Sequence, residues 1–289
     1  MSILFKNFTH FYKKIGSLSH KTRIRAAIVV AFALPLLLGF FLCVKYEKPL
    51  RYWWKHRNRH EIKAFGIKIP TKYAIHGIDV SKHQGEIEWE LATKMRSKNI
   101  RLQFAFIKAT EGVRLKDSEF DANWAAARKQ KIARGAYHFY RTNVFSGAQA
   151  AHFIKTVKLR NGDLPPVLDI EDLDGTKPEI MRKGIKNWLK IIEEHYGIAP
   201  IIYTNKDFWV QYLDTPDLRK YRLWIAHYGA ADLQLQKSTF QQRWLFWQHS
   251  DKGTVNGITE KTDFNVFCCD SIAFNAILYR NWEIKKIGK

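Results

Sequence analysis

The alternation of short apolar runs with amphipathic stretches from Tyr73 onward is the feature that most constrains the fold of this 289-residue chain. The strand-like runs are Ala74–Val80, Leu102–Ala109, Ala133–Tyr140, Val167–Glu171, Pro200–Thr204, Leu223–His227, Trp244–Gln248 and Thr262–Phe267. The helix-like stretches are Ser118–Lys131, Ser146–Lys158, Pro178–Tyr196 and a shorter Lys206–Leu213. Strands that alternate with helices predict a parallel sheet with crossover connections. Eight strands in roughly 210 residues favour a closed, TIM-like α/β barrel, and the fading helical signal after Leu223 predicts loops between its last strands.

An apolar run without a charged side chain, Ala26–Val44, precedes this region. Its length is sufficient to cross a bilayer as a helix, and a membrane helix tolerates a proline such as Pro35. A cleavable signal peptide is the alternative, but the run is long for one and no clear small-x-small site follows it. Residues 1–25 are basic and contain no acid, so the positive-inside rule keeps them in the cytoplasm. The sequence thus predicts an uncleaved anchor at 26–44, with the domain outside the cytoplasm.

The formal net charge of +21 is concentrated near the N-terminus. Residues 1–72 hold 15 Lys/Arg and 2 acids, a net of +13, which leaves +8 for the predicted barrel at 73–289. Residues 45–72 are predicted to be a basic juxtamembrane segment, either a solvated linker or a short helix on anionic headgroups. The positive excess that remains on residues 73–289 suits an anionic partner such as a cell-wall polymer, a membrane surface or nucleic acid. It does not distinguish among these partners.

Two carboxylates alternate with an apolar residue in the stretch Leu164–Asp172. Residues two apart on a strand share a face, so Asp169 and Glu171 are expected to point the same way while Ile170 packs behind them. Two carboxylates held close together do not both ionise freely, and one keeps its proton to higher pH, as a general acid requires. An acidic strand end that faces water is the competing interpretation.

Two further acids flank strands of the predicted barrel. Asp79 lies at the end of the first strand, and Asp263 lies in the last. In a barrel, the rim at the carboxyl ends of the strands is the functional face, so these acids are expected to join Asp169 and Glu171 there. When Asp79 is considered without the other acids, the alternative is that it caps a helix or turn.

Aromatic side chains cluster near the same strand ends. Sugar rings present apolar C–H faces, so aromatic side chains beside carboxylates suit a glycan cleft. Most of them are expected to be core residues, whereas Tyr137, Tyr203 and Trp247 have polar neighbours and are predicted to contact substrate.

The three cysteines do not predict a disulfide framework. Cys43 lies in the apolar run, and Cys268 and Cys269 are adjacent. Neighbouring cysteines rarely pair, and the spacing is not that of a metal site. Unpaired thiols, at least one of them buried, are therefore expected, with neither a metal nor a cofactor.

Residues 73–289 resemble the glycoside hydrolase family 25 lysozymes, the N-acetylmuramidases often called the Chalaropsis type. The matching segments are His76–Ser81, Phe106–Gly112, Gly135–Phe139, Val167–Glu171, Ile202–Thr204, Leu223–Ala226, Trp247–Gln248 and Thr262–Asn265. The resemblance implies an irregular barrel of five βα units followed by three strands, in agreement with the fading helical signal. It also implies a catalytic rim of four acids, namely Asp79, Asp169, Glu171 and Asp263.

By this resemblance, Glu171 is the general acid that protonates the β-1,4 glycosidic oxygen after N-acetylmuramic acid in peptidoglycan. Asp169 is expected to stay charged, to raise the pKa of Glu171 and to stabilise the oxocarbenium-like centre or position the acetamido group. Asp79 and Asp263 are expected to orient the sugar and tune the central pair. Glu111, in the second matching segment, is predicted to join the three aromatic residues in binding substrate.

Two alternatives from other functional classes remain. A noncatalytic, membrane-tethered glycan-binding module could use the same scaffold, although retention of all four acids argues against it. A membrane-tethered nucleic-acid-binding protein would fit the charge, but the charge is concentrated near the apolar run and the sequence has no nucleic-acid motif. Nucleic acid is therefore not expected as a partner.

Overall fold

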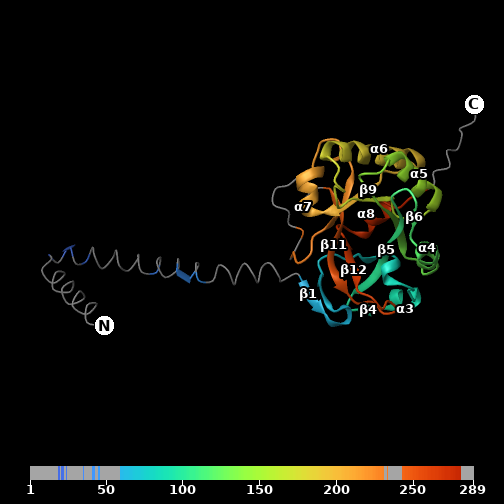
Figure 1. Ribbon diagram of the computed structural model, residues 1–289. Helices are drawn as coiled ribbons and strands as arrows, with labels where there is room; N and C mark the ends of the chain where they lie inside the picture. The colour runs from blue at the N-terminus through green and yellow to red at the C-terminus, as the bar shows by residue number, and fades with distance from the viewer. Residues whose placement is uncertain are drawn as a thin grey trace, which may run out of the picture. The chain divides into compact units, whose positions relative to one another are not determined.

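The computed structural model describes residues 59–230, Leu233 and 243–280, together with a few isolated positions before residue 46. The chain divides into two compact units, Met1–Arg57 and Asn58–Lys289, and the elements labelled in Figure 1 belong to the second. The predicted anchor at 26–44 lies, apart from isolated positions, outside the described residues. Within the part of the chain that is described, no helix has both the length and the apolar character needed to span a bilayer.

Eight strands close into a barrel in the described part of the second unit (Figure 1). They are β3 (His76–Val80), β5 (Ile100–Glu111), β7 (Ala133–Phe139), β8 (Val167–Asp169), β9 (Ile201–Asn205), β10 (Arg222–Ala226), β11 (Trp244–Gly253) and β12 (Thr262–Phe267). Neighbours pair in parallel from β3 through β5 to β11, whereas β12 is antiparallel to both β11 and β3. Each strand coincides with a predicted apolar run, so the closed α/β barrel is confirmed.

Helical segments follow the first five barrel strands and thin out afterwards, as the sequence predicts. They are α3 (Trp89–Lys94), α4 (Phe120–Lys129), α5 (Ser146–Thr156), α6 (Pro178–Tyr196), and α7 (Lys206–Phe208) continued by the π-helical turn η3 (Trp209–Leu213). After β12 comes only the short α8 (Ser271–Ala276) within the described residues. The remaining short elements are η2 (Lys82–Gln84), β4 (Arg96–Ser97) and β6 (Leu115–Lys116).

Helix α6 shows how the sequence sets an element's limits. Pro178 occupies its first turn, where its missing N–H costs nothing, and Gly197 ends it in the left-handed conformation with φ 67°. Its buried residues recur at helical spacing along one face: Met181, Ile185, Trp188, Leu189, Ile192 and Tyr196. Burial of this face holds the helix on the outside of the barrel.

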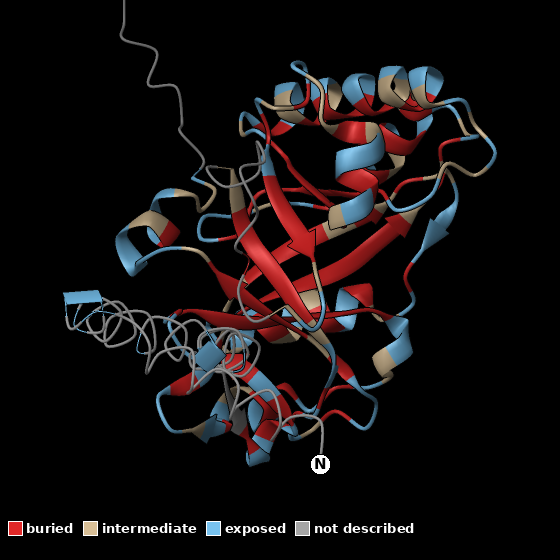
Figure 2. Cartoon of the chain, turned by 90° about the vertical axis from the view of Figure 1, so that its left-hand side faces the viewer, coloured by how far each residue is buried: buried red, intermediate tan, exposed pale blue. Residues whose placement is uncertain are grey.

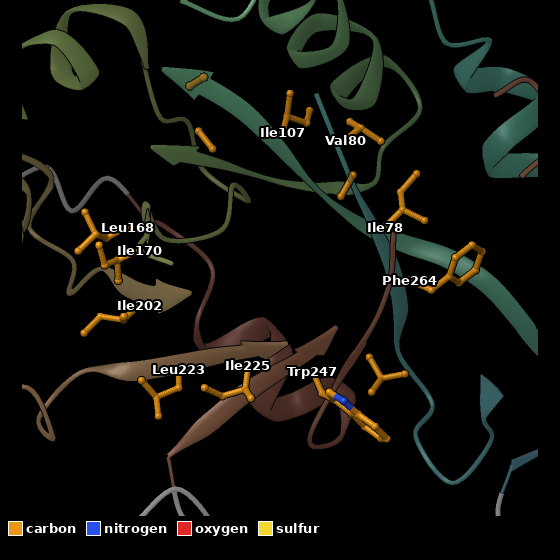
Figure 3. Close-up of a cluster of buried hydrophobic side chains, with 14 of the residues drawn as sticks. Ile78, Val80, Ile107, Leu168, Ile170, Ile202, Leu223, Ile225, Trp247 and Phe264 are labelled. Atoms are coloured by element: carbon orange, nitrogen blue, oxygen red, sulfur yellow. The ribbon is translucent and has the colours of Figure 1, made fainter. Parts of the chain in front are cut away.

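Two apolar layers hold the barrel together. Outside it, strand residues such as Ile78, Ile107 and Leu168 pack beneath the helices (Figure 3), and Figure 2 shows buried strands surrounded by helices with exposed outer faces. Inside it, Phe106 stacks on Trp224 with ring centroids 4.3 Å apart. A Cβ on Gly135 would lie 2.4 Å from Phe106, so a glycine is required there for the interior aromatic residues to fit.

An antiparallel hairpin occupies part of the predicted linker at 45–72. Strands β1 (Arg59–Ile62) and β2 (Ile67–Pro70) are joined by the short η1 (Lys63–Phe65). Phe65 is fully buried, and its ring meets that of Phe264 edge-on at 5.4 Å. These apolar side chains join the barrel core, and the hairpin belongs to the second compact unit.

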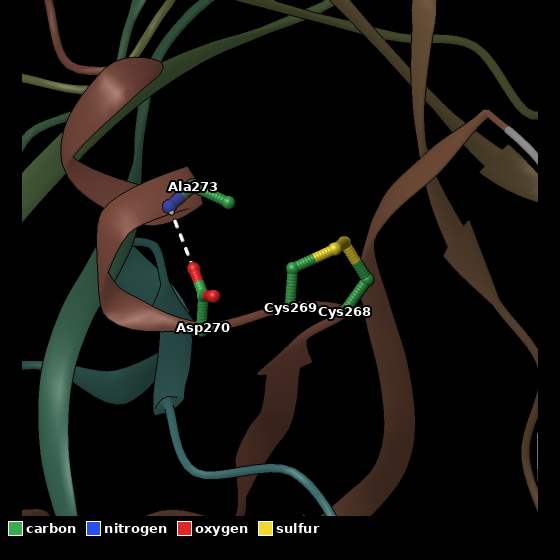
Figure 4. The surroundings of a disulfide bond; sticks show 4 residues. All are labelled: Cys268, Cys269, Asp270 and Ala273. Atoms are coloured by element: carbon green, nitrogen blue, oxygen red, sulfur yellow. Dashed lines mark hydrogen bonds between the residues drawn. A yellow bond between two sulfur atoms is a disulfide. The ribbon is translucent and has the colours of Figure 1, made fainter.

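The adjacent cysteines form a disulfide, which corrects the prediction of unpaired thiols (Figure 4). Cys268 and Cys269 lie in the bend that follows β12, and this bend turns the two side chains toward each other. Cys268 is half-buried and Cys269 is exposed, so the expectation that at least one of these cysteines is buried is also wrong.

Candidate active site

A cleft of about 340 Å³ opens at the carboxyl ends of the parallel strands. All four predicted acids line it: Asp79 from β3, Asp169 at the end of β8, Glu171 two residues later, and Asp263 from β12. Because β12 is antiparallel to its neighbours, its beginning rather than its end lies at this rim. The structure therefore brings together side chains that are up to 184 positions apart in a single cleft.

The central pair takes its geometry from the end of β8. Ile170 is fully buried and donates its backbone N–H to the Tyr203 carbonyl at 3.0 Å, so the flanking Asp169 and Glu171 face the cleft. The two carboxyl groups are hydrogen-bonded to each other. Burial raises the pKa of both groups. The Glu171 charge and the hydrogen bond raise the pKa of Asp169 further, whereas the same hydrogen bond and the Lys108 ammonium lower that of Glu171. The pair therefore holds a proton to higher pH than a lone carboxyl would.

Asp79 and Asp263 form a second pair, because they are directly opposite each other across β3 and β12. Asp79 is buried and accepts hydrogen bonds from Gln248 Nε2, at 2.9 and 3.1 Å, and from Asn265 Nδ2, at 2.6 Å. Burial raises the pKa of Asp79 to about 6, although these amides favour its ionised form. Burial and the Asp79 charge raise the pKa of Asp263 to about 9. At neutral pH, Asp263 is therefore the protonated member and donates to Asp79.

The raised pKa of Asp263 predicts a pH dependence of stability. An acid whose pKa is higher in the folded than in the unfolded state stabilises the fold at low pH, and this stability is lost as pH rises toward about 9. Asp263→Asn is therefore expected to flatten the decline in unfolding free energy between about pH 4 and pH 9, by at most about 1.4 kcal/mol per pH unit. Urea unfolding of both proteins at pH 5, 7 and 9 measures this, and parallel stability curves would contradict it.

Side-chain amides connect the Asp79 pair to the aromatic wall of the cleft. Gln248 Oε1 accepts hydrogen bonds from the hydroxyls of Tyr203 and Tyr228, at 2.8 and 2.7 Å. Asn265 Oδ1 accepts from Trp224 Nε1 at 2.7 Å. The two amides thus receive from aromatic residues and donate to Asp79. A polar residue at the end of an apolar strand, as in Trp244–Gln248, was the sequence signal for Gln248 as a site residue.

Tyr137 and Tyr203, the two tyrosines predicted to contact substrate, line the cleft together with Trp224, Tyr228 and Phe139. Trp224 lies at the base, between the stacked Phe106 inside the barrel and the Tyr203 ring at 4.4 Å. Tyr228 stands at the rim with 47% of its surface exposed.

Trp247 does not reach the cleft. Its side chain is fully buried outside the barrel (Figure 3), and its Nε1 donates to the carbonyl of His227 at 3.0 Å. Successive residues of a strand point to opposite faces, so Trp247 points outward because Gln248 points inward to Asp79. This corrects the prediction of a substrate contact for Trp247.

Glu111 lies behind the cleft wall rather than on it. Its carboxylate accepts from Lys108 Nζ at 2.8 Å and from Arg141 Nη2 at 2.6 Å. Burial opposes ionisation of Glu111, but these bonds outweigh it and hold the pKa below its usual value. Lys108, not Glu111, lines the cleft, so Glu111 fixes a cation beside the carboxylates. The sequence signal for Lys108 as a site residue was its position as a lysine within the otherwise apolar run Leu102–Ala109.

Among the residues that the structure describes, no group of three or more His, Cys, Asp or Glu side chains has an arrangement that could hold a metal ion.

The comparisons with known proteins identify the family. Residues 78–258 match the sequence family described as Glycosyl hydrolases family 25. The uncharacterized protein YegX of Escherichia coli K12 is 44% identical over 206 residues, 71% of this chain and 74% of that protein. Lysozyme M1 of Streptomyces globisporus is 35% identical over 205 residues, 67% of each chain. The structure of a family 25 glycosyl hydrolase from Bacillus anthracis aligns with a TM-score of 0.62 at 32% identity, and covers 71% of this chain and 94% of that one. The chain belongs to glycosyl hydrolase family 25.

Proposed function

We propose that this protein is a muramidase, which hydrolyses the β-1,4 bond between N-acetylmuramic acid and N-acetylglucosamine in peptidoglycan. The observation that carries the proposal is the convergence of two carboxyl pairs in one cleft walled by aromatic side chains. Relatives named as a lysozyme and as an N,O-diacetylmuramidase support the same reaction and substrate.

Glu171 is the general acid in this proposal. It lies at the open side of the cleft, where a glycosidic oxygen has access to it. Burial of the carboxyl group among neighbouring atoms raises its pKa above the usual value, against the lowering effects of the hydrogen bond with Asp169 and of the Lys108 charge. Proton transfer from such a group to the leaving oxygen is the step that glycoside hydrolysis requires.

Asp169, which lies beside Glu171 in the cleft, supplies the negative charge in this proposal. Its Oδ1 is buried and has no hydrogen-bond partner among the described residues. The Lys108 charge favours ionisation of Asp169, against the effect of burial. A carboxylate at this place stabilises the oxocarbenium-like centre or accepts a hydrogen bond from the acetamido N–H.

Asp79 and Asp263 bind and orient the sugar and tune the central pair. The Asp79 charge adds to the burial that raises the pKa of Asp169, so the two pairs influence each other electrostatically. Tyr137 and Tyr203, with the exposed Tyr228 at the rim, provide apolar faces against which pyranose rings can pack.

The test is the release of reducing ends from purified peptidoglycan by the full chain. A muramidase releases reducing ends at N-acetylmuramic acid, whereas a noncatalytic glycan-binding module binds the same material and releases none. Mass spectrometry of the products identifies the sugar at the new reducing end. A reducing end at N-acetylglucosamine would show that the enzyme cleaves the other β-1,4 bond of the glycan strand. If no reducing ends were released, only the noncatalytic glycan-binding module would remain as an explanation.

We further propose that residues 26–44 anchor the protein in a membrane, with residues 1–25 in the cytoplasm and the barrel on the cell-wall side. This rests on the apolar run Ala26–Val44 and on the basic, acid-free segment before it. Fractionation is expected to recover the mature protein with the membrane and with its N-terminus intact. A soluble protein that begins beyond Val44 would instead indicate a cleaved signal peptide. Protease that reaches the barrel only from the cytoplasmic side would reverse the orientation.

A further inference from the structure

A second, larger cavity of about 870 Å³ lies at the opposite mouth of the barrel from the catalytic cleft. Its walls come from Ile75 just before β3, from the beginnings of β5 and β7, from the ends of α3 and α4, and from α8, which follows the antiparallel β12. The catalytic cleft is built from the other ends of the same strands. We call this second cavity the basal groove.

The basal groove is strongly basic. Its charged lining comprises one acid, Asp163, and six cations, namely Lys94, Arg96, Arg101, Arg128, Lys131 and Arg134. The acid is already engaged, because Arg134 donates to both of its oxygens at 2.8 and 3.2 Å. Lys94 pairs with Glu90. Across the described ranges, no ion pair reaches Arg96, Arg101 or Lys131, all three of which are exposed.

Two of these cations are held directly opposite each other. Arg96 of β4 is the cross-strand partner of Arg101 of β5 in a two-residue antiparallel ladder. Like charges in this position repel each other, and an anion that contacts both guanidinium groups relieves the repulsion. Guanidinium groups donate in a fork that matches phosphate oxygens, so phosphate is the anion this pair fits best.

An exposed apolar side chain accompanies the charges. Ile272 on α8 is 79% exposed, and its neighbour Ser271 lines the groove. A soluble polyanion offers nothing apolar to such a side chain, whereas a lipid headgroup region accepts it. Basic side chains together with an exposed apolar one favour a bilayer surface over a phosphate polymer.

We propose that the basal groove docks the barrel on an anionic phospholipid surface, with lipid phosphates held by Arg96, Arg101 and Lys131 and with Ile272 entering the headgroup region. The proposal rests on the membrane anchoring proposed above, which keeps the barrel close to a bilayer. Because the groove and the cleft are at opposite ends of the barrel, docking by the groove turns the four acids away from the lipid and toward the glycan.

The test uses the full chain in lipid nanodiscs and follows backbone hydrogen exchange. Discs of phosphatidylglycerol mixed with phosphatidylcholine are expected to slow exchange in residues 94–103, 128–134 and 271–278, relative to discs of phosphatidylcholine alone. The double variant Arg96→Glu/Lys131→Glu is expected to lose this protection, since each basic side chain near an anionic bilayer contributes about fivefold in affinity. The matched control, Lys177→Glu/Lys183→Glu, makes the same charge change at exposed positions on and beside α6 and is expected to keep it.

Three results would overturn the proposal: equal exchange in both kinds of disc, protection retained by the groove variant, or protection lost equally by the control. Protection of the same segments in phosphatidylcholine discs by soluble poly(glycerol phosphate) would assign the groove to a polymer instead. Failure of the proposed function is seen separately. An inactive enzyme shows no reducing ends whatever its exchange pattern, and a chain without an anchor fails to enter phosphatidylcholine discs. In that last case, docking is still supported if the chain associates with phosphatidylglycerol discs and if the groove variant, but not the control, loses this association.

Discussion

Replacing Glu171 with Gln is expected to lower the rate of peptidoglycan hydrolysis by about 10²–10⁴-fold, because the amide cannot donate the proton that the departing sugar oxygen needs. The side chain lies at the open side of the cleft and outside the apolar core, so the fold is expected to be retained. The rate of reducing-end release measures the effect, and the melting temperature of each protein reports the fold.

Asp172→Asn is the matched control for this substitution. Asp172 is the next residue along the chain and is exposed, but it does not line the cleft. Its carboxylate accepts a hydrogen bond from the backbone N–H of Asp174, and an asparagine oxygen can accept the same bond. The control is expected to retain activity. Near-native turnover by a folded Glu171→Gln protein would remove Glu171 from the role of general acid.

The barrel could be predicted from the sequence because its strands are buried on both sides. A strand between an apolar interior and a layer of helices is a nearly continuous apolar run, and each such run proved to be a strand. The hairpin at β1 and β2 was missed for the opposite reason. Its buried Ile67 and Ile69 alternate with Lys68 in a segment whose charge suggested a linker.

The four acids could be predicted because strand ends in a barrel meet at one rim, whatever their separation in sequence. The local strand register decides which of the neighbouring residues face the cleft. This register is harder to predict from the sequence than the positions of the strand ends. The pairing of β10 with β11 shifts between Leu223 and Trp224, so the alternation along β11 could not be counted from its neighbours. Trp247 was assigned to the cleft because of its polar neighbours, but the neighbour Gln248 is the residue that faces Asp79. Glu111 was predicted to contact substrate, whereas Lys108 is the residue that lines the cleft. The sequence did not show this because the ion pair between the two residues is formed only in the folded chain.

The second large effect is expected from Asp169→Asn, which separates catalysis from sugar binding. Burial raises the pKa of Asp169 well above its usual value, and the charge of Glu171 raises it further. Loss of the last proton leaves two adjacent negative charges, so the pair keeps that proton to higher pH than a lone carboxyl would. With an uncharged Asn at 169, Glu171 loses its proton at lower pH, and the alkaline limb of the pH–rate profile shifts to lower pH. The rate at the optimum is also expected to fall by about 10²-fold or more, because no negative charge faces the developing cation.

Lys108→Met gives the opposing change in the same cleft and makes the sign of the shift testable. Lys108 lowers the pKa of both Asp169 and Glu171, so its removal lets Glu171 keep its proton longer and is expected to move the alkaline limb to higher pH. The pH–rate profiles of the three proteins on peptidoglycan measure both shifts, and glycan affinity measured alongside separates turnover from binding. Opposite shifts, with a lowered rate for Asp169→Asn, are the result expected of a working carboxyl pair. If neither substitution moves the alkaline limb and the rate of Asp169→Asn is unchanged, then Asp169 and Glu171 do not act as a pair, and the noncatalytic glycan-binding module becomes the better description of the barrel.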